Sequence, residues 1–206
     1  MSPVEFGAGR SLLYIVLAMV TALHPAWAAG GQAGDHTEKH ASESRGPLYR
    51  VFRQLRRAHW VIEGHSRRIM YVFFDPNCPY CHILYDVSQR FVRSGLVEMR
   101  WIPVGMLAPS SGGKAAAILG ARDPRAALEQ NEDHYRHPGG GGIVPIRGSR
   151  TVRAELETNL ELFQQTGAGG VPLILWEDQA GHIRMQDGAV DAETLVSLIH
   201  QIRPRR

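Results

Sequence analysis

Cysteine is almost absent from this chain of 206 residues, which has only Cys78 and Cys81. Because there is no third cysteine, the pair has no other intramolecular disulfide partner, and a framework of several structural disulfides is excluded. A ring closed between two cysteines three positions apart constrains little of the unfolded chain, so it would be a poor structural staple. The two thiols are therefore candidates for chemistry.

Long apolar runs are also scarce. The run from Leu12 to Leu23 is too short to span a membrane comfortably, and no second stretch approaches spanning length. Ala26-Trp27-Ala28 follows, with small residues on both sides of a bulky one, as signal peptidase requires. We expect residues 1–28 to be a cleaved signal peptide, an uncleaved anchor being the alternative. The mature chain would then be exported to a compartment that permits disulfides.

Between Gly30 and Gly46 no aliphatic residue larger than alanine occurs, so residues 29–47 are predicted to be a polar, disordered segment. The remaining residues 48–206 suffice for one domain. The net charge is only +3, although arginines cluster in two places. Since no nucleic-acid-binding motif accompanies them, the first cluster is predicted to be a solvated helix face, with no nucleic-acid partner. The clusters are Arg50, Arg53, Arg56, Arg57, Arg67 and Arg68, and then Arg203, Arg205 and Arg206.

The hydrophobic pattern predicts alternating helices and strands. The uncharged, aromatic and β-branched run 69–74 is typical of a strand buried on both faces. Further strands are predicted over 97–104, 171–176 and 183–185, and helices over 48–55, 78–94, 114–119, 151–165, from Asp123 and from Asp191. Residues 138–142 are predicted to be a flexible break. This order predicts an α/β fold with a small mixed sheet covered on both faces and an all-helical insertion at about 108–166.

The cysteine pair lies where the buried strand meets a helix, as Cys78-Pro79-Tyr80-Cys81. At a helix N-terminus, free backbone N–H groups and the helix dipole stabilise a thiolate, so the pair is typical of a redox-active thiol–disulfide site. A c-type haem attachment site is an alternative, because His82 completes a C-x-x-C-H motif. Zinc is disfavoured, since no second cysteine pair is present.

A second feature supports the redox interpretation. In Gly169-Gly170-Val171-Pro172 a proline begins a predicted strand. In thioredoxin-like folds a cis proline at this point lies beside the cysteine pair, so we predict a cis Val171–Pro172 bond. Val171 would then offer its backbone to an extended client peptide.

The chain resembles the catalytic domain of the DsbC/DsbG-type thiol:disulfide interchange proteins, and is nearer the DsbG branch. The likeness rests on 58–64 and on Tyr71 to Cys81 (YVFFDPNCPYC), and continues through 104–105, 115–119, 123–124 and 171–172. It implies a periplasmic thioredoxin fold, preceded by a linker helix, with no cofactor beyond the cysteines and no metal. It also implies exported clients with thiols or disulfides and a membrane redox partner that recycles the site.

By residue match, the resemblance makes Cys78 the attacking cysteine, Cys81 the resolving cysteine and Pro172 the cis proline, with Pro79 and Tyr80 tuning the potential and Val171 contacting the client. The buried acid that thioredoxins place six residues before the first cysteine is Val72 here. Asp75 is interpreted as a turn residue, and His82 as a surface or core polar residue.

Two departures from the family shape the expectations. No separate dimerisation domain precedes residue 48, so we expect a monomer, or at most a weak dimer. Val171 replaces the usual threonine before the cis proline, which leaves the direction of electron flow open. The alternatives within this class are an oxidase, a reductase or isomerase, and a sulfenic-acid reductase. A disulfide-handling chaperone, whose peptide groove matters more than turnover, is the competing class.

Overall fold

The computed structural model describes residues 46–206. The predicted signal peptide and nearly all of the predicted polar segment lie outside them. The first described element, α2 (Gly46–Gln54), continues into a short 3₁₀ helix, η1 (Leu55–Arg57), and begins two residues before the predicted domain start. Along the described residues, no helix has the length and apolar character needed to cross a membrane.

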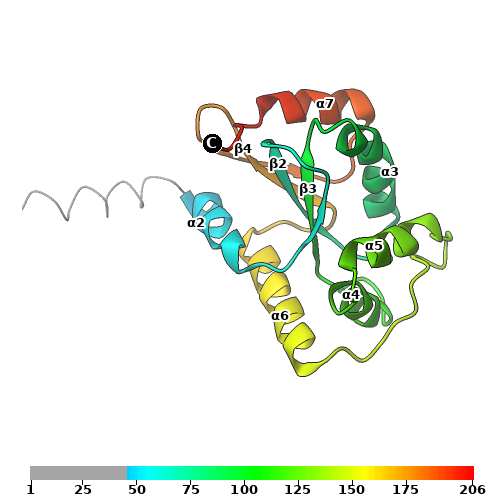
Figure 1. The fold of residues 1–206 in the computed structure, drawn as a ribbon. Helices are drawn as coiled ribbons and strands as arrows, with labels where there is room; N and C mark the ends of the chain where they lie inside the picture. Colours follow the sequence, from blue (N-terminus) through cyan, green and yellow to red (C-terminus); the bar gives the residue numbers. More distant parts are fainter. Residues whose placement is uncertain (1–45) are drawn as a thin grey trace, which may run out of the picture.

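Five strands form one mixed sheet in the order β1-β3-β2-β4-β5 (Figure 1). The central strands β2 (Ile69–Phe74) and β3 (Glu98–Pro103) are parallel. β1 (Val61–Glu63), β4 (Leu173–Glu177) and β5 (Ile183–Asp187) each pair antiparallel with their neighbours. All six residues of β2 are buried, which confirms the prediction from its uncharged sequence.

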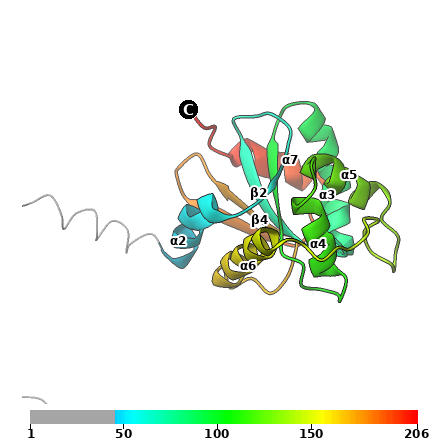
Figure 2. The same ribbon diagram turned by 60° about the horizontal axis from the view of Figure 1, so that its bottom comes forward.

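Helices cover both faces of the sheet (Figures 1 and 2). α3 (Pro79–Arg93) and α7 (Ala192–Gln201) bury Leu84, Leu195 and Ile199 against one face. On the other face η1 and α6 (Arg150–Gln165) bury Leu55, Leu162 and Phe163. The sheet thus separates two apolar cores, and the predicted α/β fold class is confirmed.

Three helices lie between β3 and β4, as the predicted helical insertion requires: α4 (Ser111–Leu119), α5 (Pro124–Asp133) and α6. Asp123 caps α5 by accepting a hydrogen bond from the Ala126 N–H, and Asp191 caps α7 through the Thr194 N–H. α4 begins three residues earlier than predicted, and β4 begins two residues later.

Residues 138–142 are not the flexible break that their glycines suggested. The Gly141 N–H donates to the carbonyl of Pro76, and the Gly142 N–H donates to the carbonyl of Asn131. Gly140 and Gly141 are buried, and a Cβ atom at either position would collide with the side chain of Asn77 or Asn131. The glycines therefore permit close packing against the loop that leads to Cys78.

Candidate active site

Cys78 lies at the junction of β2 and α3. It is the N-cap of α3, with extended backbone angles, and its Sγ accepts a hydrogen bond from the Cys81 N–H at 3.3 Å. Pro79 occupies the first turn, where a proline lacks only an N–H that has no partner within the helix. The sulfur of Cys78 therefore takes the place of the side-chain oxygen that usually caps a helix.

The two thiols are free and differ in acidity. The Cys81 side chain, followed by backbone N–H groups at the start of α3, stabilises the Cys78 thiolate and lowers the pKa of Cys78, although burial acts in the opposite direction. Burial, then the neighbouring Cys78, raises the pKa of Cys81 well above its ordinary value. Both residues are buried, so the two thiols differ in acidity rather than in exposure.

The Val171–Pro172 peptide bond is cis, as predicted from the sequence. The Cys78 thiol lies 3.4 Å from the carbonyl oxygen of Val171, to which it donates. Among the described residues, the N–H of Val171 has no hydrogen-bond partner. The structure thus brings together Cys78 and Val171, which are 93 positions apart. A second cis bond, His137–Pro138, was not predicted.

Apolar side chains are exposed around the cysteine pair. Tyr80, between the two cysteines, is 63% exposed, and Ile83 follows on the same helix. Met106 and Leu107 are also exposed, in the loop whose N–H groups bind the Asp75 carboxylate at 2.6 and 2.9 Å. Exposed apolar groups beside a buried nucleophile are suited to contact an extended polypeptide.

Asp75 organises the loop that precedes the cysteines. The side chain is buried, and besides the two N–H groups of 106–107 it accepts hydrogen bonds from Ser111 Oγ at 2.7 Å and from the Asn77 N–H at 2.9 Å. Its carbonyl accepts from the Cys78 N–H. The turn role predicted for Asp75 is correct, but the residue also fixes the insertion to the active-site loop.

Lys114 anchors the same loop from the other side. It is the one lysine among the described residues, and its Nζ donates at 2.6 Å to Asn77 Oδ1 and at 2.6 Å to the carbonyl of Gly141. The Asn77 amide donates in turn to Ser111 Oγ at 2.8 Å. Asn77, directly before Cys78, is thus held by α4 and by the glycine loop together.

A buried acid that sequence reasoning missed lies beside the cysteine helix. Glu132 on α5 is 3% exposed and lies 3.1 Å from His82 Nδ1. The His82 ring stacks on Tyr135 with 4.4 Å between centroids, and the Tyr135 hydroxyl donates to the carbonyl of Asn77. The negative charge of Glu132 contributes to the raised pKa of Cys81.

His82 is therefore neither a plain surface residue nor a free ligand. The hydrogen bond to Glu132 raises the pKa of His82, opposed by burial and assisted by Asp86, which lies 3.5 Å from Nε2. Since both ring nitrogens face carboxylates and the ring is stacked, the arrangement does not favour the haem alternative, in which His82 would ligate iron.

Comparison with known proteins places this geometry in a family. A family model described as a thioredoxin-like domain matches residues 55–203. The chain belongs to the thioredoxin-like domain family. It is 34% identical over 100 residues to the thiol:disulfide interchange protein DsbG of Pseudomonas aeruginosa, and 37% identical over 84 residues to that of Escherichia coli. These matches cover 43% and 40% of this chain, and they confirm the resemblance to DsbG-type proteins.

The matches span only 39% and 34% of the length of those two relatives. Solved structures agree in fold. Proteus mirabilis ScsC in a compact conformation superposes with a TM-score of 0.61 at 19% identity, covering 80% of this chain and 85% of that one. A periplasmic thioredoxin-like protein from Salmonella enterica serovar Typhimurium gives 0.56 at 21% identity, covering 82% and 97%.

Proposed function

We propose that this protein is an exported thiol:disulfide oxidoreductase that exchanges disulfides with client proteins through Cys78 and Cys81. One observation carries the proposal: Cys78 caps α3 with a lowered pKa, beside Cys81 with a raised pKa and 3.4 Å from the Val171 carbonyl. The thioredoxin-like family and the likeness to DsbG support the same activity.

In the reductive direction, the Cys78 thiolate attacks one sulfur of a client disulfide. A bond forms between Cys78 Sγ and that sulfur, while the client S–S bond breaks and the second client sulfur leaves as a thiolate that takes a proton from water. The backbone N–H groups at the start of α3 favour the attacking thiolate. They also make Cys78 a good leaving group in the oxidative direction, when a client thiolate attacks the client sulfur of the mixed disulfide and Cys78 departs as a thiolate.

Cys81 completes the exchange. Its thiol loses a proton, attacks Cys78 Sγ and releases the client's first sulfur, so that the Cys78–Cys81 disulfide holds the oxidised state. Two electrons have then passed from the dithiol to the client. Burial and then the neighbouring Cys78 raise the pKa of Cys81, and the charge of Cys78 is lost when Cys78 enters the mixed disulfide, so Cys81 deprotonates more easily at that stage. Oxidation of a client dithiol follows the same steps in reverse.

The backbone of Val171 would bind the client next to the reacting sulfurs. Its N–H has no partner among the described residues, and its carbonyl faces Cys78, so an extended client segment can add there through main-chain hydrogen bonds. The exposed side chains of Tyr80, Ile83, Met106 and Leu107 would contact the flanking client residues. Pro79 and Tyr80 would set the potential through their effect on the first turn of α3.

The proposed location is the periplasm, after removal of residues 1–28, and a membrane redox partner would recycle the cysteine pair. The apolar run 12–23 and Ala26-Trp27-Ala28 support export, as does the likeness to DsbG. Fractionation of cells that express the full chain would test this, because a cytosolic, unprocessed product would contradict it.

Insulin reduction with dithiothreitol as electron source tests the activity. We expect turnover by the purified chain, no turnover by Cys78→Ala, and trapped client adducts only with Cys81→Ala. Equal client capture by Cys78→Ala and the unmodified chain would instead favour a binding module without exchange chemistry. Equilibration with glutathione buffers would then give the potential of the pair, which determines the direction of exchange.

A further inference from the structure

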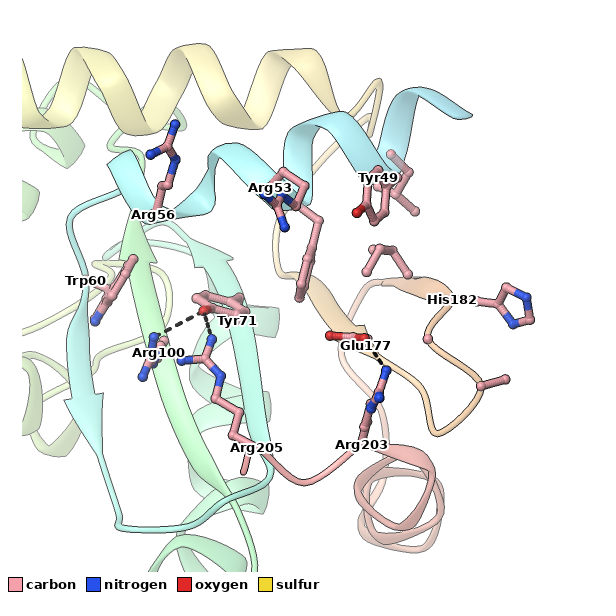
Figure 3. Close-up of a pocket in the computed structure, with 15 residues that line it drawn as sticks. Tyr49, Arg53, Arg56, Trp60, Tyr71, Arg100, Glu177, His182, Arg203 and Arg205 are labelled. Carbon is pink, nitrogen blue, oxygen red and sulfur yellow. Dashed lines mark hydrogen bonds and ion pairs between the residues drawn. The ribbon is translucent and has the colours of Figure 1, made fainter. Parts of the chain in front are cut away.

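A cavity of about 1240 Å³ lies apart from the cysteine site, and no residue of that site lines it (Figure 3). Residues of α2 and η1 form one wall. The turn between β4 and β5 and the tail after α7 form the opposite wall, while Tyr71 of β2 and Arg100 of β3 lie between them. The volume exceeds what a bound inorganic ion requires and leaves room for a small organic molecule.

Arginine dominates the charge of this cavity. Five arginines line it, whereas Glu177 is the one carboxylate among the lining residues. Arg100 pairs with Glu98 at 2.8 Å, and Arg203 pairs with Glu177 at 3.1 Å. The other three have no carboxylate partner within residues 46–206: Arg53, Arg56 and Arg205. The cavity therefore keeps an excess of positive charge.

The hydroxyl of Tyr71 adds a donor without an acceptor. Its oxygen accepts hydrogen bonds from Arg100 at 3.1 Å and from Arg205 at 2.6 Å (Figure 3). Two donors occupy the oxygen, and no residue in the described part of the chain accepts the hydroxyl proton. Both interactions use the oxygen as an acceptor, so the hydroxyl proton is left to donate to a group bound in the cavity.

Aromatic side chains stand beside these donors. Phe52 and Trp60 pack edge-on against Tyr71, with centroids 5.6 and 5.7 Å apart. The Arg100 guanidinium lies 4.9 Å from the centre of the Trp60 ring. These contacts fix the aromatic wall and hold the Arg100 guanidinium in place.

We propose that this cavity binds a small organic anion with a phosphate or carboxylate group next to an apolar, ring-sized part. Guanidinium groups match both oxyanions with paired N–H donors, and the Tyr71 hydroxyl supplies a further donor. The ring-sized part packs on Phe52 and Trp60.

Arginines of the first cluster found in the sequence thus have different surroundings in the structure. Arg57 lies near Glu161, at 3.7 Å, and does not line the cavity, which fits the predicted solvated face. Arg53 and Arg56, one turn apart on α2 and η1, line the cavity instead. Arg57 therefore offers a matched control within the same segment.

Calorimetric titration of the purified chain at low salt tests the proposal with four probes: phenyl phosphate, benzoate, inorganic phosphate and benzyl alcohol. We expect phenyl phosphate or benzoate to bind more tightly than inorganic phosphate, and benzyl alcohol not to bind. The ratio between phenyl phosphate and benzoate distinguishes a phosphate ligand from a carboxylate ligand. Added salt should weaken the binding.

Exchange of Arg53 and Arg56 together for Gln should weaken the binding roughly tenfold or more, because hydrogen bonds to charged groups are lost. Arg57→Gln should leave it unchanged, and Tyr71→Phe should weaken it while the guanidinium groups remain. Insulin turnover should not change in the double variant.

Three results would overturn the proposal: no binding of either ring-bearing anion, equal binding of benzyl alcohol, or an equal loss in Arg57→Gln. Binding of duplex DNA without binding of phenyl phosphate would also overturn it, since the site would then be an open polyanion surface. None of these outcomes bears on the cysteine chemistry, so this proposal and the proposed function fail separately.

Discussion

At the scale of single residues, the pKa values of two cysteines in one helical turn are shifted in opposite directions. The Cys81 side chain and the backbone N–H groups of the first turn stabilise the Cys78 thiolate and lower its pKa. Burial, followed by the neighbouring Cys78, raises the pKa of Cys81. The sequence alone predicts this asymmetry, because the helix start follows from Asp75-Pro76-Asn77 and Pro79.

Alkylation of the reduced chain should therefore report Cys78. Its folded-state pKa is lowered, so the thiolate fraction, and with it the iodoacetamide rate, should reach half its maximum below the ordinary thiol value of about 8.5. The rate should fall only as the pH drops through that lowered value. Cys81→Ala should still react at Cys78, with its half-maximum shifted to higher pH because the Cys81 side chain no longer stabilises the thiolate, whereas Cys78→Ala should lose the reaction. Faster modification of Cys81 would contradict the assignment.

The contact between His82 and Glu132 makes a second prediction. Because the hydrogen bond to Glu132 is the largest cause of the raised pKa of His82, Glu132→Gln should lower that pKa. Burial disfavours the charged ring, and without the Glu132 carboxylate less remains to offset that effect on the pKa. Proton NMR titration of the His82 ring measures the change. Asp86→Asn is the matched control and should lower the pKa less, because Asp86 is mostly exposed. An unchanged pKa in Glu132→Gln would show that the contact does not hold in solution.

At the scale of elements, the loop before Cys78 depends on parts of the chain far away in sequence. Lys114 of α4 donates to Asn77 Oδ1 and to the Gly141 carbonyl, both at 2.6 Å. We expect Lys114→Met to lower the free energy of unfolding by about 2 kcal/mol, because the buried Gly141 carbonyl and the half-buried Asn77 Oδ1 lose their donor. Urea unfolding measures this.

Ser110→Ala is the control for Lys114→Met. It removes one of two acceptors of the Asn77 amide, since Ser111 Oγ remains, so its cost should be clearly smaller. Equal costs for the two variants would argue against a specific anchoring role for Lys114.

A substitution at Val171 tests the proposed client-binding role of this segment without a large effect on the stability of the fold. Its side chain is half-buried between the two cores, so Val171→Thr should change the melting temperature by only a few degrees. A hydroxyl beside the Cys78 sulfur adds a polar group at the client's position. We expect the ratio of scrambled-ribonuclease isomerisation to insulin reduction to rise. An unchanged ratio, and unchanged clients trapped in the Cys81→Ala background, would contradict a role for this side chain.

The sequence predicts some elements and misses others, and the difference depends on how far away in sequence their stabilising contacts lie. The start of α3 and the caps Asp123 and Asp191 depend on neighbours within a few positions, and all were predicted. β2 was predicted from its own uncharged, aromatic and β-branched residues, although its partners β3 and β4 lie far away in sequence. The packing of 138–142 and the position of Glu132 depend on contacts with 76–82, more than 45 positions away. Single-sequence periodicity contains no such information, so a polyglycine run was interpreted as flexible and the buried acid was missed.

At the scale of the whole molecule, the described elements use their apolar faces internally. α2 and η1 bury Val51 and Leu55 and pack Phe52 against Tyr71 at 5.6 Å, so this segment packs on the sheet of its own domain. Among the exposed large apolar residues, Tyr80 and Ile83 lie on the cysteine helix, where a client would bind.

Light scattering on the purified chain at micromolar concentration should therefore give the mass of one chain. A monomer presents one cysteine site to one client, so it should reduce or oxidise single disulfides faster than it rearranges scrambled ones. Phe52→Ser is the control variant. If α2 packs on the sheet of the same chain, this variant should lose stability while it remains monomeric. A stable dimer that dissociates in Phe52→Ser would show that α2 is an interface between copies, and that the cavity it borders closes only on assembly.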